Sequence, residues 1–149
     1  TLFLIFLEFF RGKWYDSIRF KKMIIGVGTD AISIPRVRGM KKRWGNKFLN
    51  RVFTPSEKKY CNQYSDPSQH YAVRFAAKEA TSKALGVGFG QELDWKDIVV
   101  SNNKEGKPFI KFRNAVAKKM KKNGYKCHLS LAHCTDYATA VSILELEPN

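Results

Sequence analysis

The chain has 149 residues, and 27 lysines and arginines against 13 aspartates and glutamates give a net charge of +14 with the histidines neutral. With 44% hydrophobic and 13% aromatic residues it can bury a core, which excludes a disordered basic tail. Three widely spaced cysteines without a C-x-x-C pattern exclude a disulfide framework and a zinc ribbon, and favour a reducing compartment.

The N-terminal segment is apolar but too short to span a membrane. A spanning helix needs about 20 apolar residues, whereas the apolar run TLFLIFLEFF occupies only the first ten. Because Met23 can serve as an initiator and opens a predicted strand, residues 1–22 are interpreted as an N-terminal extension, compatible with a targeting remnant. An amphipathic helix packed on the domain is the alternative. Residues 23–149 are predicted to form a single domain.

The domain is predicted to begin with a strand and a basic helix. The segment Met23–Asp30 alternates apolar and small residues, which predicts a strand running into a turn loosened by Gly26 and Gly28. From Ile34 to Arg51 apolar residues recur at helical spacing, while seven basic residues and no acidic one occupy other positions. This pattern predicts a cationic helix, or a helix pair interrupted at Gly45.

Two further helices have clear local signals. Thr54-Pro-Ser-Glu57 supplies an N-cap, a proline in the first turn and a capping-box glutamate, so a helix should run from here to about Tyr64. The segment His70–Leu85 is predicted to form a long helix closed by Gly86. Its alanines would allow close packing against a neighbouring element.

The second half of the domain is predicted to be mainly strands. Ile98–Ser101 and Phe109–Phe112 flank the turn sequence NNKEGKP, which indicates a hairpin. Ala115–Lys122 reads as a short basic helix, and Cys127–His133 and Tyr137–Leu146 as a second hairpin. The predicted fold class is therefore α+β, with an antiparallel sheet packed against the long helix and the helices on one side.

The long helix carries the densest set of candidate functional residues. Glu79 and Lys83 are four residues apart and share a helix face, so a solvated ion pair between them is the simplest interpretation. The surrounding alanines suggest that much of this helix is buried, where a carboxylate needs a cation or a metal. Asp30 is a second carboxylate at a strand end, and two carboxylates with water and phosphate oxygens suit Mg²⁺.

The glycine and histidine spacings of the sequence argue against common nucleotide-binding and metal-binding sites. The glycines around Gly26 and Gly86 lack the G-x-G-x-x-G spacing of a dinucleotide site, and the chain has no G-x-x-x-x-G-K-[ST] motif. His128 and His133 are five residues apart on a predicted strand, which places them on opposite faces. They are therefore not expected to bind one metal together.

Three segments in order resemble a known family: Ile24-Ile-Gly-Val-Gly-Thr-Asp30, then Arg74-Phe-Ala-Ala-Lys-Glu-Ala-Thr-Ser-Lys-Ala-Leu-Gly86, then His128-Leu-Ser-Leu-Ala-His133 with Asp136-Tyr-Ala138. Together they look like the 4′-phosphopantetheinyl transferases of the short holo-(acyl-carrier-protein) synthase type. The likeness continues through Phe48–Glu57, Leu93–Ile98 and Gly106–Pro108, and covers about residues 23–147.

The resemblance implies Mg²⁺-dependent transfer of the phosphopantetheine arm of coenzyme A to a serine of an acyl carrier protein, with release of 3′,5′-ADP, for fatty acid biosynthesis. Asp30 and Glu79 match the family's metal ligands. Lys83 matches a lysine that contacts the phosphates and can protonate the leaving group, and His133 a histidine near the coenzyme A phosphates. Arg74 matches a phosphate contact, and the coenzyme A site would also include Gly86 and Gly88. Glu79 or a metal-bound water would act as general base on the carrier serine.

The resemblance also implies partners. Arg36 matches an arginine that docks the acidic carrier protein, and the basic helix with Met40, Arg43 and Trp44 would steer that protein to the site. In the short type of this family the active site lies between the subunits of a homotrimer. The expected location is intracellular, in a bacterial-type cytoplasm or in an organelle that makes fatty acids, such as a plastid.

The sequence departs from the family pattern at three positions. Val87 replaces the threonine of the family's G-T-G, Ala132 stands where many members have serine or threonine, and Ser33 replaces a frequent acidic residue. Two rival readings come from other classes. A basic nucleic-acid-binding module rests on the +14 charge, but no recognised nucleic-acid-binding motif accompanies it. A peripheral membrane protein rests on the apolar run TLFLIFLEFF together with basic residues, and it is the weaker alternative.

Overall fold

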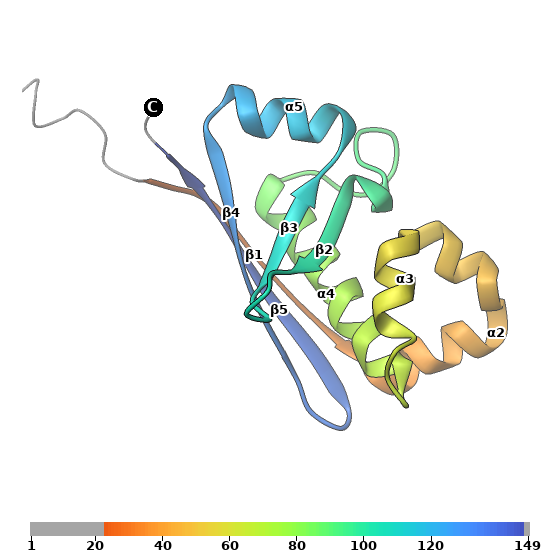
Figure 1. The fold of residues 1–149 in the computed structure, drawn as a ribbon. Helices are drawn as coiled ribbons and strands as arrows, with labels where there is room; N and C mark the ends of the chain where they lie inside the picture. The colour runs from red at the N-terminus through yellow and green to blue at the C-terminus, as the bar shows by residue number, and fades with distance from the viewer. Residues whose placement is uncertain (1–22, 148–149) are drawn as a thin grey trace, which may run out of the picture.

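The computed structural model describes residues 23–147, and its elements follow the predicted order closely. The predicted α+β fold is confirmed, but the helix predicted to run from Thr54 to about Tyr64 ends at Cys61, and the long helix starts at Pro67 rather than at His70. The N-terminal extension lies outside the described residues. The elements are β1 (Met23–Ser33), α2 (Ile34–Val52), α3 (Pro55–Cys61), α4 (Pro67–Leu85), the short 3-10 helix η1 (Trp95–Asp97), β2 (Ile98–Asn102), β3 (Pro108–Phe112), α5 (Asn114–Lys122), β4 (Tyr125–His133) and β5 (Tyr137–Leu146) (Figure 1).

The strands form two antiparallel sheets around the long helix. One sheet has three strands in the order β1-β5-β4, and the β2–β3 hairpin forms the other. Helix α4 packs on one face of the three-stranded sheet, with the hairpin on its other side (Figure 1). Its alanines Ala76, Ala77 and Ala80 are fully inaccessible, as expected for a helix enclosed on much of its circumference.

Gly26 and Gly28 have a different role from the one expected. They do not loosen a turn, because β1 continues through them to Ser33. A Cβ on Gly28 would lie only 1.9 Å from the carbonyl oxygen of Ala80, and one on Gly26 2.1 Å from that of Ala84. The glycines therefore allow the backbone of α4 to approach β1, which brings Asp30 beside the helix.

The basic helix α2 is bent as expected. Its N-cap is Ser33, whose hydroxyl accepts a hydrogen bond from the backbone N–H of Arg36 at 3.3 Å. Gly45 has φ 50° and ψ −131°, which interrupts the helix at the predicted position. Ile34, Val37, Leu49 and Val52 face the core, so the basic side chains of α2 remain at the surface.

An ion pair is buried inside the core. Glu57 and Lys78 are 1% and 0% exposed, and their Oε2 and Nζ atoms lie 3.0 Å apart. The Lys78 ammonium also donates to the carbonyl oxygens of Trp95, at 2.8 Å, and Ile98, at 2.6 Å. Glu57 in turn accepts the backbone N–H of Val100 at 2.9 Å. This network joins α3, α4, η1 and β2 in one place.

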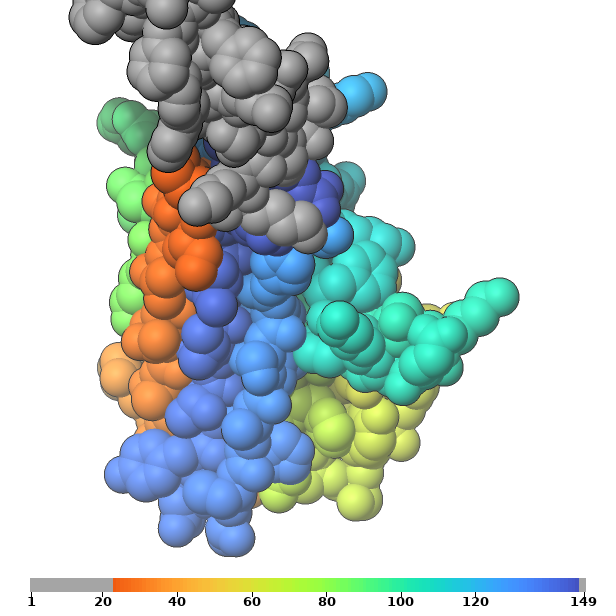
Figure 2. Space-filling view, turned by 90° about the vertical axis from the view of Figure 1, so that its left-hand side faces the viewer, coloured from red at the N-terminus to blue at the C-terminus, as the bar shows by residue number. Residues whose placement is uncertain are grey.

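The outer face of the three-stranded sheet is uncovered by any described helix. Figure 2 shows β1, β5 and β4 side by side on this face. The strand register places small or apolar uncharged side chains across its middle. They are Val27, Thr29, Ala31, Ser130, Ala132, Thr139 and Val141.

The cysteines and the described helices bear on two further expectations. Cys61, Cys127 and Cys134 are free thiols. Among the helices within residues 23–147, none has both the length and the apolar character needed to cross a membrane.

Candidate active site

Three predicted residues meet where β1 passes α4. The ammonium of Lys83 donates to the Asp30 carboxylate at 2.9 Å and to the carbonyl oxygen of Thr29 at 2.9 Å. The expected Glu79–Lys83 pair is therefore replaced by an ion pair between α4 and β1. The carboxylate of Glu79 makes no hydrogen bond or ion pair within the described part of the chain.

The environment of Glu79 disfavours its charge. Burial raises the pKa of the Glu79 carboxyl, and the charge of Asp30 raises it further, while Lys83 opposes the shift. Two carboxylates near each other, one of them without a partner, favour a bound cation. A carboxyl group with a raised pKa, next to a second carboxylate in a hollow, is typical of a functional site.

The basic helix contributes to the same hollow. A hollow of about 300 Å³ is lined by Asp30 and Glu79 together with Arg36 and Met40 of α2. Two of the predicted docking residues thus lie beside the two predicted metal ligands. A protein that docks on this end of α2 would reach the carboxylates directly.

A second hollow lies on the other side of Glu79, at the C-terminal end of α4. It has a volume of about 530 Å³ and is lined by Glu79, Lys83, Gly86 and Gly88. Gly86 closes α4 in the left-handed conformation at φ 71°. The stacked rings of Phe89 and Trp95, with centroids 3.8 Å apart, form an apolar wall.

Arg74 and His133 lie elsewhere, on the opposite side of α4. Arg74 is 3% exposed, donates to the Asn102 amide oxygen at 3.1 Å and stacks on Tyr60, with 3.9 Å from its guanidinium carbon to the ring centroid. His133 lies at the end of β4, and β5 separates β4 from β1. One chain therefore carries two clusters, one around Asp30 and one around Arg74 and His133, which it does not bring together.

The two histidines of β4 point to opposite faces, as predicted. His128 lies on the outer face, with its Nε2 atom 2.7 Å from a Glu145 carboxylate oxygen. His133 lies on the α4 face, with its ring centroid 6.2 Å from that of His70.

The remaining predicted docking residues extend along α2. Trp44 is 46% exposed, and the guanidinium of Arg43 lies 5.1 Å from the centroid of its ring. Trp44 also lines a hollow of about 590 Å³ with Phe48 and Arg51, two residues that were not selected from the sequence. Their helical spacing with Trp44 was the available signal.

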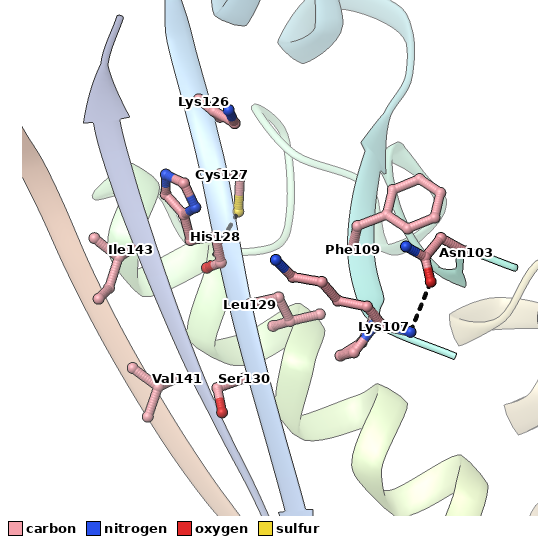
Figure 3. A pocket seen from close by; sticks show the side chains of 11 residues that line it. Asn103, Lys107, Phe109, Lys126, Cys127, His128, Leu129, Ser130, Val141 and Ile143 are labelled. Carbon is pink, nitrogen blue, oxygen red and sulfur yellow. Dashed lines mark hydrogen bonds between the residues drawn. The ribbon is translucent and has the colours of Figure 1, made fainter. Parts of the chain in front are cut away.

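A groove separates the hairpin from the main sheet. It has a volume of about 480 Å³, and Figure 3 shows Lys107 reaching from the start of β3 toward β4. Phe109 and Leu129 line its two sides, and Lys126 adds a second ammonium. The groove lies next to Asn102, the residue that holds Arg74.

The donor set fits Mg²⁺ better than a metal that needs a complete protein cage. No group of three or more histidine, cysteine or acidic side chains within residues 23–147 is arranged to hold a metal ion. Mg²⁺ is usually held by one or two carboxylates together with water and substrate phosphates. Asp30 and the unpartnered carboxylate of Glu79 satisfy that requirement.

Comparison with known proteins places the chain among one group of relatives. Residues 26–142 match the model of the 4′-phosphopantetheinyl transferase superfamily. Holo-(acyl-carrier-protein) synthase of Ehrlichia chaffeensis is 45% identical over 129 residues, which cover 84% of this chain and 99% of that protein.

Solved structures show the same likeness. The crystal structure of the synthase from Neisseria meningitidis superposes with a TM-score of 0.76 at 32% identity, covering 82% of this chain and 98% of that one. The synthase from Bacillus anthracis, solved in complex with CoA (3′,5′-ADP), superposes with a TM-score of 0.70 at 34% identity, covering 83% and 97%.

Proposed function

The chain belongs to the 4′-phosphopantetheinyl transferase superfamily, and from this membership we infer that it is a holo-(acyl-carrier-protein) synthase. It transfers the 4′-phosphopantetheine group of coenzyme A to a serine of apo acyl carrier protein, giving the holo carrier and 3′,5′-ADP. The structural observation that best supports this inference is the cluster of Asp30, Glu79 and Lys83 beside α2.

We propose that Asp30 and Glu79 hold Mg²⁺. When bound, the ion would neutralise negative charge on the diphosphate of coenzyme A. The bond between the transferred phosphorus and the leaving phosphate lies in this diphosphate. Lys83 is held by Asp30 and by the Thr29 carbonyl, so its ammonium is oriented before substrate arrives. It can donate a hydrogen bond to the departing phosphate without reorganisation. The main demands of phosphoryl transfer, positioning and charge neutralisation, are thus met.

The hydroxyl proton of the carrier-protein serine needs an acceptor near Asp30 and Glu79. Asp30 is already engaged by Lys83. Glu79 has no such partner among the described residues, and it lines both hollows beside α4. We therefore propose that Glu79, or a water on the ion that it would hold, receives this proton.

Docking of an acidic carrier protein on α2 makes a specific prediction for Arg36. Replacing Arg36 by glutamate should raise the KM for carrier protein about tenfold, equivalent to about 1.4 kcal/mol of binding. The salt dependence of that KM should become flatter, because one attractive charge becomes repulsive. Steady-state kinetics at several salt concentrations measures both effects.

Lys42→Glu is the matched control for Arg36. It makes the same charge change on α2 at an exposed position that lines none of the hollows described. We expect its KM to change about twofold or less, through the general field of the protein. Equal effects of the two variants would indicate that α2 only attracts the carrier and that Arg36 does not dock it.

We further propose that the active site is completed between subunits of a homotrimer. The two clusters of one chain lie on opposite sides of α4, whose body is about 10 Å across. Coenzyme A would contact Asp30, Glu79 and Lys83 of one subunit and an Arg74–His133 cluster of a second subunit. The uncharged middle of the outer sheet face supports this assembly, because Val27 and Val141 remain 57% and 37% exposed in the single chain.

A shared site predicts complementation between two inactive variants. Glu79→Gln retains the Arg74–His133 cluster, and His133→Ala retains the carboxylates. When the two chains are co-expressed with different tags and mixed trimers are isolated, about one third of the interfaces should combine two intact halves. Activity near a third of wild type is expected. Activity no higher than the sum of the separate variants would place a complete site within each chain.

The proposed reaction is tested by intact mass spectrometry of an apo acyl carrier protein incubated with this protein, coenzyme A and Mg²⁺. A mass gain of one phosphopantetheine that disappears with EDTA is expected. No gain with several carriers, together with salt-sensitive binding to nucleic acid, would favour the nucleic-acid-binding alternative.

We also propose that residues 23–149 act as one domain and that the enzyme works inside the cell, as its bacterial relatives suggest.

A further inference from the structure

An aromatic stack surrounds His70 at the first turns of α4. The rings of His70 and Tyr64 are stacked, with centroids 3.6 Å apart, and Tyr60 meets His70 edge-on at 6.1 Å. The ring of His133 lies 6.2 Å from that of His70 on another side. The stack fixes the plane of the His70 imidazole without using its nitrogens, because no described residue hydrogen-bonds to them.

The cluster carries unused donors and an excess of positive charge. Arg74 lies four residues after His70 on the same face of α4. It makes one hydrogen bond, to Asn102, and its buried Nε has no partner among the described residues. The acidic side chain that acts on His70 is Asp66, which is already paired with Arg38 at 2.8 Å. The guanidinium of Arg74 therefore disfavours a bound cation next to His70 and favours a bound anion.

We propose that His70 is a further phosphate-binding residue of the half-site formed by Arg74 and His133. Two imidazoles with centroids 6.2 Å apart can both donate to oxygens of one phosphate group, with Arg74 supplying the fixed charge. This inference rests on the proposed function, since coenzyme A supplies the phosphate. Both the diphosphate and the separate 3′-phosphate of coenzyme A have the required chemistry.

A binding role for His70 makes phosphate affinity depend on pH. The groups that face His70 are Tyr60, Tyr64, Asp66, Arg74 and His133. Burial, together with the charges of Arg74 and His133, lowers the pKa of His70, while Asp66 raises it. Free His70 is therefore largely neutral at pH 7. Phosphate favours its protonated form, so binding should take up a proton, and affinity should fall as the pH rises.

The test uses the full-length protein and the imidazole signals of its three histidines in an NMR titration. Inorganic phosphate should raise the pKa of His70 and shift the ring signals of His133, and it should leave the ring signals of His128, on the outer sheet face, in place. Sodium chloride at equal ionic strength should have no such effect. A shift of His133 without His70, or no shift of either, would overturn the proposal. None of these signals depends on the transfer reaction, so the proposed function is judged separately.

A variant and a second pair of ligands complete the test. His70→Phe keeps a ring to stack on Tyr64 but removes the donors, and should weaken binding of 3′,5′-ADP about fivefold at pH 6, with the gap closing by pH 8. Calorimetry in buffers of different ionisation enthalpy should show less proton uptake than in wild type. Wild-type affinity and uptake in this variant would contradict the proposal. Comparing 3′,5′-ADP with 5′-AMP tells which phosphate is bound.

Discussion

Replacement of Glu79 by glutamine is expected to lower kcat about 10²- to 10³-fold, equivalent to about 3–4 kcal/mol of transition-state stabilisation. The amide has nearly the same shape, but it cannot supply a negative charge to Mg²⁺ or accept the proton of the carrier serine. Turnover of apo carrier protein, followed by intact mass at saturating coenzyme A and Mg²⁺, measures the effect.

The same variant should fold normally, which separates a site defect from a folding defect. Glu79 makes no hydrogen bond within the described residues, and its raised pKa means that the folded state binds its proton more tightly than the unfolded chain does. Without Mg²⁺, this group therefore adds stability as the pH falls through its folded pKa, and Glu79→Gln should lack that increment. Mg²⁺ should raise the melting temperature of wild type in the presence of 3′,5′-ADP but not that of the variant. Near-wild-type turnover would rule out the metal assignment.

The second large effect is expected in stability. Replacing Lys78 by methionine should lower the free energy of unfolding by about 3–5 kcal/mol, because it leaves the buried charge of Glu57 without its partner. The carbonyl oxygens of Trp95 and Ile98 lose their donor as well. At fixed protein concentration, the midpoint of urea unfolding should fall by about 2 M.

Two controls distinguish the buried pair from a general effect of losing a lysine. Lys118→Met makes the same change at an exposed position of α5 and should alter stability by less than about 0.5 kcal/mol. The double variant Glu57→Gln/Lys78→Met removes the uncompensated charge and should recover part of the loss. If Lys78→Met and Lys118→Met unfold at the same urea concentration, the buried network does not stabilise the fold.

Two neighbouring residues of α4, Lys78 and Glu79, have different roles, one in stability and one in the proposed active site. Lys78 and Glu79 are adjacent in sequence but point to different sides of α4. Lys78 ties the helix to η1 and β2, and Trp95 of η1 lines the hollow at Glu79. The sequence pattern pointed to Glu79 as a functional residue but gave no sign that Lys78 is buried. The burial of a lysine in an alanine-rich helix cannot be inferred from that helix alone. It becomes evident only when the tertiary structure places Glu57 of another helix beside it.

Local signals were enough to predict the order and type of the α-helices and strands, although not the short helix η1. The capping box at Thr54 and Glu57 is formed, Gly45 interrupts α2, and β5 has the predicted bounds. These features depend on residues a few positions apart in the sequence. The conformational preferences of such residues act locally and do not require a particular tertiary environment. The opposite orientation of His128 and His133 followed likewise from the two-residue period of a strand.

The chemistry of the site was only partly predictable. By itself the sequence determined which residues carry charge, which lie on one helix face, and which family the motifs resemble. Only the tertiary structure decided that Lys83 pairs with Asp30 instead of Glu79, and that Gly28 makes room for the backbone at Ala80 instead of loosening a turn. It also placed Arg74 and His133 across α4 from the carboxylates. In each case the partners lie 50 or more residues apart in the sequence, or on opposite sides of a helix, and a contact of that kind is set by packing rather than by local preference.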